Sequence, residues 1–366
     1  MGKIFVGVLV VFILVGFGGR LAWKRLQSSQ RAAAEKEALL AVPAVAPQPP
    51  VPAWPPPEQA LAEFRLSPAV QPLPAALEKA SRDCRTGIVV DLTQGDILWQ
   101  KNPDEPVEIA SMTKMMTAYL LMRAVYVEKR ATLADVVPVS RTAAGIGGSQ
   151  VWIAEGEHFT LEELSCCMMI RSANDATHLI AEHLAGGSAD AFVAAMNEKA
   201  QQLGLTQMRF YNAHGLPPDK LRKQPENQGS ARELAFLASR LLDYPDVVRW
   251  ASTREDSLTH QKGKTLVTQY TNHNTLLGVC PGVNGMKTGY TAKSMYCTTV
   301  TCTRNGRTLI VVLTGCPRGR PFGALRDNLV RQFLEWAYAQ TSAPPPPVVP
   351  GLPSAAAPAA PAPVRR

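Results

Sequence analysis

The chain has 366 residues, of which 46% are hydrophobic and 19% charged, so it can bury a core and is not disordered throughout. Its 26 glycines show no three-residue period, which excludes collagen, and the composition does not indicate a coiled coil. The formal charge of +8 comes from lysines and arginines scattered singly, without interleaved aromatic residues, and we therefore expect no nucleic-acid partner. The same charge suits attraction to anionic lipid or to an anionic wall polymer.

The first predicted element is an apolar run over residues 4–19, which follows Lys3 and precedes three basic residues. As a helix rising about 1.5 Å per residue it is shorter than a hydrocarbon core of roughly 30 Å, so a cleaved signal peptide and a short uncleaved anchor both fit. No clear small-residue cleavage site follows the run, and this favours an uncleaved anchor. More positive charge lies after the run than before it, and this argues against an anchor with its folded domain outside. We predict that residues 1–24 are a signal peptide or an N-terminal membrane anchor.

Proline is concentrated in two stretches, residues 43–57 and 344–366, which together hold 17 of the 30 prolines. Proline-rich chain lacks backbone donors and favours extended polyproline II, so it serves as a spacer and does not build a packed layer. The predicted organisation is a helical and proline-rich linker over residues 25–72, a folded domain over 73–340 and a disordered Pro/Ala-rich tail over 341–366.

The folded domain is predicted to begin with short elements. We expect a helix over residues 73–81, and then two strands over 86–90 and 96–100 that a turn joins into a hairpin. From Ser111 onward, apolar residues recur at helical spacing and predict a helix that reaches about residue 129 and faces the core with a methionine-rich stripe.

The rest of the domain is predicted to be helical in the middle and to end in strands and a last helix. Further helices are predicted over residues 161–169, 175–184, 189–203, 231–242 and 323–338. Two β-branched runs over 295–303 and 308–314 flank an Asn-Gly turn, which predicts an antiparallel hairpin. Because strands at both ends enclose a helical middle, the predicted fold class is α+β: an antiparallel sheet flanked by helices, with an adjoining helical subdomain.

Cysteine and histidine give no sign of a metal or a cofactor. The seven cysteines are an odd number without a C-x-x-C pair, so they predict neither a zinc ribbon nor a disulfide framework, and most are expected to be small core residues. Cys297 and Cys302 flank a predicted strand and could pair with another cysteine. The six histidines include no H-E-x-x-H, and His178 and His183, five residues apart, do not share a helix face. We expect no metal and no cofactor.

Three short motifs carry the chemistry, and the first is Ser111-Met-Thr-Lys114 at the start of the long predicted helix. Residues three apart lie on one helix face, so the lysine amine can approach the serine hydroxyl and, with a lowered pKa, take its proton. A helix N-terminus also offers a backbone N–H where an oxyanion forms. Taken alone, the motif is more often a serine that caps a helix.

The second motif, Ser172-Ala-Asn174, lies between two predicted helices, and the third, Lys287-Thr288-Gly289, precedes Tyr290. A simple turn explains the second motif by itself, and the third is nearly uninformative by itself. In the third, glycine admits a close approach of backbone, threonine offers a hydroxyl and lysine a positive charge, on a strand edge where an extended substrate could pair.

The three motifs in this order are typical of class A β-lactamases and penicillin-binding proteins. Over residues 80–338 the sequence resembles the low-molecular-mass D-alanyl-D-alanine carboxypeptidases, the serine penicillin-binding proteins that trim peptidoglycan stem peptides. The resemblance extends beyond the motifs to stretches such as IASMTKMMTA, RSANDATHLIAEHLAG, FYNAHGL, NHNTLLG and VNGMKTGYT.

This resemblance implies a role for five catalytic residues. Ser111 would attack the carbonyl of the penultimate D-Ala and form an acyl-enzyme, with Lys114 as its base. Ser172 would pass a proton to the leaving D-Ala amine, while Asn174 would hold the substrate's amide. Lys287 would support this proton path electrostatically.

The resemblance also implies substrate-binding residues on and near the third motif. Thr288 would bind the terminal carboxylate, Gly289 would admit the substrate backbone, and the backbone N–H groups of Ser111 and Tyr290 would form the oxyanion hole. An arginine completes carboxylate recognition in related enzymes, and the matching position is Arg326. Two further arginines compete for this role, at positions 318 and 320.

Two departures from the family pattern stand out. Ser294-Met295 replaces a small Ala-Gly pair and adds bulk beside the cleft, so substrate preference is expected to shift. The family often has a C-terminal β-rich domain with a membrane-binding helix, and nothing after Tyr338 resembles one, so any anchoring is expected from the N-terminal segment.

The function implied is that of a serine D-Ala-D-Ala carboxypeptidase of the cell envelope, on the extracytoplasmic side of the membrane. Its expected partners are the peptidoglycan pentapeptide as substrate, β-lactam antibiotics as inhibitors and the membrane through the N-terminal segment. Two alternatives stay open: a DD-endopeptidase on crosslinked peptides, and a non-hydrolytic wall-binding or β-lactam-sensing module. A class A β-lactamase needs a second glutamate to activate water, and no convincing counterpart is found.

Overall fold

The computed structural model describes residues 58–218, 224–261 and 266–340. The predicted signal or anchor segment, the first part of the predicted linker, including the helix-like stretch in it, and the predicted tail lie outside these residues. In the described part of the chain, no helix is both long enough and apolar enough to cross a membrane.

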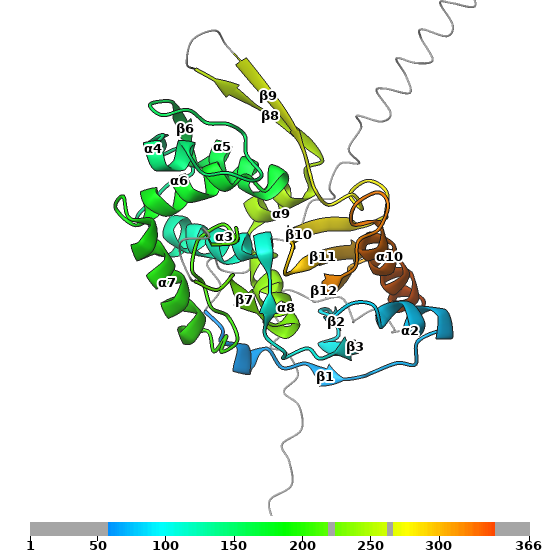
Figure 1. The fold of residues 1–366 in the computed structure, drawn as a ribbon. Coiled ribbons are helices and arrows are strands. Elements are labelled where there is room, and N and C mark those ends of the chain that lie inside the picture. Colours follow the sequence, from blue (N-terminus) through cyan, green and yellow to red (C-terminus); the bar gives the residue numbers. More distant parts are fainter. Residues whose placement is uncertain (1–57, 219–223, 262–265, 341–366) are drawn as a thin grey trace, which may run out of the picture. The chain divides into compact units, whose positions relative to one another are not determined.

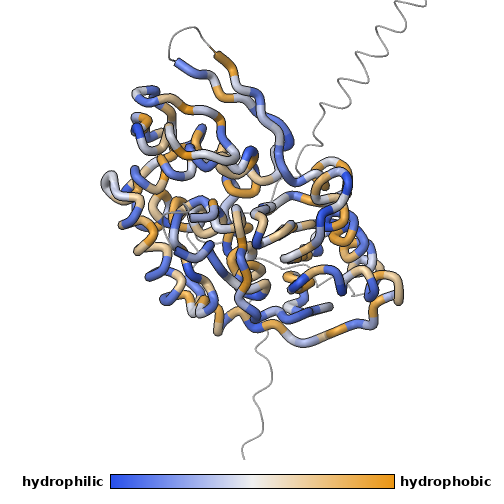
Figure 2. The backbone as a smooth tube through the Cα atoms, viewed as in Figure 1, coloured by the Kyte–Doolittle hydropathy of each residue, from blue (hydrophilic) through white to orange (hydrophobic). Residues whose placement is uncertain are grey.

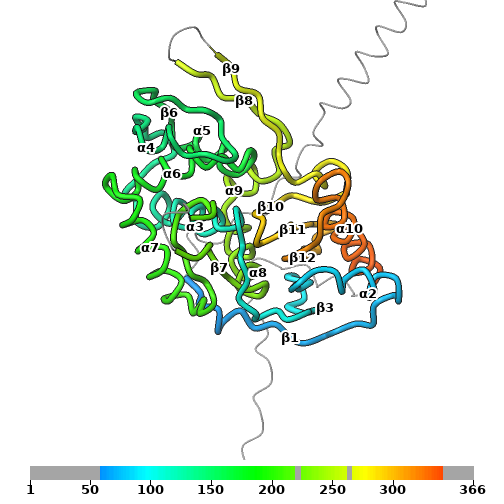
Figure 3. The backbone as a smooth tube through the Cα atoms, in the orientation of Figure 1, coloured from blue at the N-terminus to red at the C-terminus, as the bar shows by residue number. Residues whose placement is uncertain are grey.

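The centre of the fold is a six-stranded sheet with the strand order β1-β3-β2-β12-β11-β10 (Figure 1). Its strands are β1 (Ser67–Pro68), β2 (Thr86–Asp91), β3 (Asp96–Lys101), β10 (Val283–Thr291), β11 (Met295–Arg304) and β12 (Arg307–Cys316). All neighbours are antiparallel except β1, which pairs parallel to β3. Strands from both ends of the domain therefore lie side by side: β2 pairs with β12 (Figure 1), and the colours of Figure 3 show the cyan start of the domain next to its orange end. The predicted α+β fold with an antiparallel sheet is confirmed, with one short parallel strand added at its edge.

Both predicted hairpins form, and local sequence explains their turns. Asn305 and Gly306 join β11 to β12 with φ angles of 51° and 78°, which asparagine and glycine tolerate better than other residues. Gly95, with φ of 74°, ends the turn between β2 and β3 in the same left-handed region. The central strands are buried on both faces because helices cover each side.

Helices α10 (Ala324–Ala339) and α2 (Ala75–Ser81) pack together beside the sheet, and α8 (Ala231–Leu241) contacts β2 and β12. A core cluster joins α10 to the sheet, and in it the rings of Trp99 and Phe333 lie 4.5 Å apart. The helix α8 begins with a capping box, since Ser230 and Glu233 each bond the other's backbone N–H. These contacts fix the sheet between two helical layers.

The helical subdomain is built on the other side of α8 (Figure 1). It contains α3 (Lys114–Met122), α4 (Arg141–Ala144), α5 (Leu161–Cys166), α6 (Asn174–Leu184) and α7 (Ala189–Gln202). The helices predicted over 111–129 and 161–169 are not uniform. The first begins as a 3-10 turn, Ala110–Thr113, and ends as a π turn, Arg123–Val127, while the second ends as a π turn, Cys167–Arg171. Such irregular turns are frequent at functional sites.

Several elements were not expected from the sequence. A helix α9 (Pro245–Ser252) and a hairpin of β8 (Glu255–His260) and β9 (Leu266–Thr271) connect the subdomain to β10. Figure 2 shows this hairpin as largely hydrophilic apart from the start of β9, so it lacks the alternation that would predict a strand. Two-residue and three-residue strands form two small sheets, β4 (Val107–Glu108) with β7 (Gln228–Gly229), and β5 (Val136–Pro138) with β6 (His158–Thr160).

Residues 58–72, which fall within the predicted linker, lie against the folded domain. A 3-10 turn, Leu61–Glu63, donates a backbone hydrogen bond from Leu61 to the Leu203 carbonyl, and β1 follows it along β3. The Glu58 carboxylate lies 2.9 Å from the Lys199 ammonium. The folded part of the chain thus begins before residue 73, the predicted boundary.

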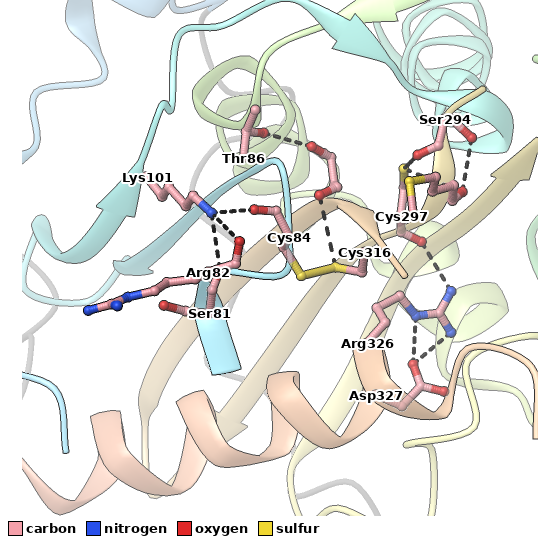
Figure 4. Close-up of a disulfide and its surroundings, with 12 residues drawn as sticks. Ser81, Arg82, Cys84, Thr86, Lys101, Ser294, Cys297, Cys316, Arg326 and Asp327 are labelled. Carbon is pink, nitrogen blue, oxygen red and sulfur yellow. Dashed lines mark hydrogen bonds and ion pairs between the residues drawn. A yellow bond between two sulfur atoms is a disulfide. The ribbon is translucent and has the colours of Figure 1, made fainter. Parts of the chain in front are cut away.

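The structure contains a disulfide that the sequence analysis did not favour. Cys84, just before β2, is bonded to Cys316 at the end of β12 (Figure 4). The two residues are 232 positions apart in the sequence, so no local spacing signals their pairing. Cys297 and Cys302 are instead buried free thiols, in keeping with the expectation that most cysteines are core residues.

Candidate active site

All three motifs line one cleft of about 480 Å³ at the free edge of β10. The edge strand β10 forms one wall of the cleft, and the 3-10 turn that leads into α3 packs against it. The lining residues are Ser111, Ser149, Ser172, Thr271, Asn272, His273, Thr275, Thr288, Gly289, Tyr290, Tyr296, Phe322 and Arg326. Among the described residues, the cleft lining therefore contains no carboxylate, and Arg326 supplies its positive charge.

Ser111 lies in the 3-10 turn and Lys114 is the first residue of α3. The Lys114 side chain is fully buried, and its Nζ lies 3.1 Å from Ser111 Oγ, 2.7 Å from Asn174 Oδ1 and 2.6 Å from the His214 carbonyl oxygen. Burial, and then the charge of Lys287, hold the pKa of Lys114 well below its usual range, with Asp175 acting in the opposite direction. A lysine with such a pKa can be neutral and accept the proton of the serine hydroxyl.

The backbone around Ser111 is held in an uncommon conformation. Ala110, which precedes the serine, has φ of 45°, and Gly215 packs directly on its carbonyl group. A side chain on Gly215 would place a Cβ 1.9 Å from that oxygen, so only glycine fits there. Ser111 makes no side-chain cap of α3, and the simple capping interpretation of the motif is therefore wrong.

Ser172 lines the cleft from the junction of α5 and α6, and Asn174, the first residue of α6, is buried behind it. Ser172 follows the π turn with φ of 62°, a left-handed conformation that non-glycine residues rarely adopt. Ser172 is part of the cleft lining, and its buried Oγ has no hydrogen-bond partner among the described residues. Asn174 donates from Nδ2 to the Gly147 carbonyl at 2.9 Å while its Oδ1 faces Lys114. A buried hydroxyl without a protein partner points to a group supplied by a ligand.

The third motif lies on β10. Lys287 is buried, and burial together with the charge of Arg326 lowers its pKa to about 7. Gly289 has to be glycine, because a Cβ there would lie 2.9 Å from the Ile109 carbonyl oxygen and 3.1 Å from the Ser111 nitrogen. This close approach to Ser111 is made one residue before Tyr290, on a strand edge that no other strand covers in the described part of the chain.

Arg326 is the arginine that the structure brings into the cleft. It is 5% exposed, and it donates from Nε to Asp327 at 2.7 Å and from Nη1 to the Cys297 carbonyl at 3.2 Å (Figure 4). Gly323 leaves room for its guanidinium group. The two competing arginines are exposed and do not line the cleft, and the guanidinium of Arg318 lies over the Phe322 ring at 4.2 Å.

Sequence reasoning missed other residues of this site. His273 lines the cleft, and burial, followed by the charges of Lys287 and Arg171, lowers its pKa to about 3, so its ring is neutral. His214 supplies the carbonyl that faces Lys114. Both histidines lie inside stretches that carried the family resemblance, but neither belongs to a chemical motif that could have identified it. Among the described residues, no group of three His, Cys, Asp or Glu could hold a metal ion.

Comparison with known proteins gives a consistent answer. A family model described as D-alanyl-D-alanine carboxypeptidase, Peptidase_S11, matches residues 74–317. The chain is 33% identical to the D-alanyl-D-alanine carboxypeptidase DacF of Bacillus subtilis over 260 residues, which cover 71% of this chain and 63% of DacF. It is 30% identical to DacC of Escherichia coli over 282 residues, 75% of this chain and 66% of DacC. The chain thus spans slightly less than two thirds of these relatives.

A solved structure supports the same assignment. Penicillin-binding protein D2 of Listeria monocytogenes, in its ampicillin-bound form, superposes with a TM-score of 0.59 at 25% identity, and the match covers 70% of this chain and 98% of that one. The matched fold, the matched sequence and the three motifs in one cleft agree with one another. The chain belongs to the D-alanyl-D-alanine carboxypeptidase family of serine peptidases.

Proposed function

We propose that the chain is a serine D-Ala-D-Ala carboxypeptidase that removes the terminal D-Ala from peptidoglycan pentapeptides and is acylated by β-lactams. One observation carries the proposal: the buried amine of Lys114, with its lowered pKa, lies 3.1 Å from Ser111 Oγ in an open cleft. A serine hydroxyl is a weak nucleophile until a neighbouring base removes its proton. The family membership and the ampicillin complex of a relative support the same reaction.

In the acylation step, Ser111 Oγ attacks the carbonyl carbon of the penultimate D-Ala and gives its proton to Lys114. The backbone N–H groups of Ser111 and Tyr290, which Gly289 brings together, stabilise the negative charge that forms on the carbonyl oxygen. Because these donors are fixed before the substrate arrives, no reorganisation is needed as the charge develops.

Collapse of this intermediate breaks the C–N bond, and the leaving D-Ala amine needs a proton. Ser172 is suited to deliver it, because its hydroxyl is buried at the cleft without a protein partner among the described residues. The proton on Lys114 replaces the one that Ser172 gives. Asn174, which contacts Lys114, holds the substrate's amide, and the positive charge of Lys287 supports the transfer.

Recognition of the terminal carboxylate falls to Thr288 and Arg326, which both line the cleft. A free carboxylate forms charge-assisted hydrogen bonds with arginine that are stronger than those between neutral groups. Since no carboxylate lines the cleft among the described residues, a negatively charged peptide end meets no like charge there that would repel it. In the second half of the reaction, water attacks the acyl carbon, Lys114 accepts its proton, and Ser111 and the tetrapeptide are released.

We place this activity on the extracytoplasmic side of the membrane. The disulfide between Cys84 and Cys316 supports this location, because such bonds persist in oxidising compartments and are rare in the cytosol. The apolar run at residues 4–19 supports export, either as a cleaved signal or as an anchor.

The test is product analysis of the full chain with two substrates, a peptidoglycan pentapeptide and a crosslinked peptide dimer. We expect release of free D-Ala from the pentapeptide, loss of this activity in Ser111→Ala, and its retention in Ser188→Ala, a matched change at the N-cap of α7 that belongs to none of the motifs and does not line the cleft. Faster cleavage of the dimer would replace the proposal with the endopeptidase alternative. Acylation by penicillin without turnover of either peptide would favour a β-lactam-sensing module.

A further inference from the structure

The disulfide lies at the end of a row of residues that crosses the sheet to the cleft. On β10, Tyr290 pairs with Tyr296 of β11, and Tyr296 pairs in turn with Cys316 of β12, which is bonded to Cys84. The rings of Tyr290 and Tyr296 lie 4.5 Å apart, and both line the cleft. The covalent bond is therefore connected to the proposed oxyanion strand through two consecutive backbone pairings.

Cys316 also lies where β12 leaves the sheet. The last pair between β12 and β2 is Thr314 with Thr86, whose hydroxyls lie 2.7 Å apart. Beyond it, Gly315 has φ of 63° and the register of β12 against β11 shifts, which is a β-bulge. Beyond the last β2–β12 pair, the disulfide is thus the link between the end of β12 and the residues just before β2.

The Cys84 end of the disulfide is firmly held. The Lys101 ammonium lies 2.8 Å from the Arg82 carbonyl and 2.5 Å from the Cys84 carbonyl, at the C-terminal end of α2, as Figure 4 shows. A cation at this end of a helix is favourable, because the last carbonyl groups lack partners within the helix. Cys84 is thus a fixed point, next to which the end of β12 is anchored.

The chain after Cys316 leads directly to the carboxylate-binding side of the cleft. The loop over residues 317–323 carries Phe322, which lines the cleft, and ends at Gly323, which is the N-cap of α10 and packs against the Arg326 guanidinium. The Cys297 carbonyl, which bonds Arg326, belongs to the residue after Tyr296 on β11 (Figure 4). Two of the groups around Arg326, the Cys297 carbonyl and Gly323, therefore belong to the residue after Tyr296 and to the loop that follows Cys316. The third, Asp327, follows Arg326 on α10.

We propose that the Cys84–Cys316 disulfide is a positioning element for the carboxylate-binding side of the cleft, so that selectivity for a free terminal carboxylate depends on this bond. This inference rests on the proposed carboxypeptidase function. Without the bond, the end of β12 loses its anchor to Cys84. The loop over residues 317–323 and Arg326 are then no longer held in position from this side. The Ser111–Lys114 pair is held by other elements, α3 and α6, and keeps its geometry.

The test compares the full chain with Cys84→Ser/Cys316→Ser on two peptides that differ only at the end, one in D-alanine and one in D-alaninamide. We expect kcat/KM for the acid peptide to fall by about tenfold or more in the variant, as expected for a misplaced binding group, and kcat/KM for the amide to stay close to that of the native chain. Phe192→Ala is the control, because it removes a buried side chain on α7, away from the loop, and should leave the acid-to-amide ratio unchanged.

A second measurement covers the case in which the double variant does not fold. The native chain is unfolded in urea with dithiothreitol, which loses two electrons and two protons and becomes its cyclic disulfide, while Cys84 and Cys316 are reduced to thiols. After both reagents are removed, the chain is refolded with and without glutathione disulfide, which reoxidises the two thiols and becomes two glutathione molecules. The reoxidised chain should regain the native ratio and the reduced chain should not. Equal losses on both peptides, or an unchanged ratio in the reduced chain, would overturn the inference. Absence of any activity in the native chain would instead refute the proposed function.

Discussion

The two walls of the cleft hold their functional groups by different means. In the helical wall, Ser111 and Ser172 depend on backbone in the left-handed region, with φ of 45° at Ala110 and 62° at Ser172. The buried amine of Lys114 joins both motifs of this wall through contacts with Ser111 and Asn174. Such strained positions persist where the surrounding structure enforces them, and they are common at reactive sites.

The strand wall consists of regular extended backbone instead. Residues of β10 keep an unbroken antiparallel register with β11 from Met286 to Thr291, and the requirement there is space, which Gly289 provides. Arg326 reaches this wall from α10 and is held by Asp327 and a backbone carbonyl. Changes in the helical wall should therefore remove the nucleophile or its base, while changes in the strand wall should alter which substrate is held and how well the developing oxyanion is stabilised.

The largest effect predicted for the strand wall is that of Gly289→Ala. Its Cβ would come within 2.9 Å of the Ile109 carbonyl oxygen, so β10 must move away from Ser111 and separate the two oxyanion donors. We expect kcat to fall by about 10²–10³-fold, the usual cost of losing one such donor, with little change in folding. Gly145→Ala, where the added Cβ makes ordinary contacts at 3.5 Å, is the matched control. Native kcat in Gly289→Ala would show that the close approach is not needed.

Arg326→Ala should have the next largest effect. Loss of a charged hydrogen bond to the substrate carboxylate should lower kcat/KM by roughly 10–100-fold for peptides with a free carboxylate and much less for the corresponding amides. Steady-state kinetics on the two peptides measures this difference, with Arg318→Ala as the exposed control. If the two peptides lose activity equally, Arg326 is a structural residue, and the carboxylate is bound elsewhere.

Lys287→Gln tests whether the charge of Lys287 in the strand wall lowers the pKa of Lys114 in the helical wall, and the pH dependence of kcat/KM is the measurement. Activity should rise with pH as the Lys114 amine loses its proton, and the charge of Lys287 lowers the pKa of that amine. Removing this charge should therefore move the acidic limb of the kcat/KM profile to higher pH. In the free native enzyme, Lys287 itself loses its charge as the pH rises through about 7. We therefore expect kcat/KM, which reports the free enzyme, to decline on the alkaline side of the profile. The exposed control Lys293→Gln should leave the acidic limb in place. The same result in Lys287→Gln would show that the Lys287 charge does not set the pKa of Lys114.

The smallest effect concerns Met295, which has φ of 55° where the family usually has glycine. Met295→Gly should relieve a conformational cost of about 1–2 kcal/mol, largely offset by the greater freedom of glycine in the unfolded chain. The melting temperature should therefore change little in Met295→Gly. Met295→Ala is the comparison variant, because it keeps the left-handed conformation of a non-glycine residue and removes the long side chain. Faster acylation by bulky β-lactams in both variants would show that the Met295 side chain restricts the cleft, and unchanged rates in both would show that it does not.

The sequence predicted the elements whose signals are local. The hairpin of β11 and β12, with its Asn-Gly turn, and the amphipathic helix α8 were found because periodicity and turn chemistry lie within short windows. The hairpin of β8 and β9 was missed because eight of its twelve residues are exposed, and its sequence shows no regular alternation of apolar and polar residues. The pairing of Cys84 with Cys316 depends on the finished sheet, which brings together residues 232 positions apart.

The same distinction holds for the site. The three motifs could be predicted because their residue types and order are specific, and the structure gathers them in one cleft. Tertiary packing places His273 in the cleft and the His214 carbonyl beside Lys114, and no spacing in the sequence predicts either position. The choice of Arg326 over Arg318 also required the structure, because the three arginines lie within nine residues of chain.

The most direct test of the central claim, that Ser111 is the nucleophile activated by Lys114, is the intact mass of the full chain after incubation with benzylpenicillin. We predict one added penicilloyl group on the native chain and on Ser188→Ala, and none on Ser111→Ala. Lys114→Ala should acquire the group about 10²–10⁴ times more slowly, because it lacks the base. An unmodified native chain, or an adduct that persists in Ser111→Ala, would contradict the claim.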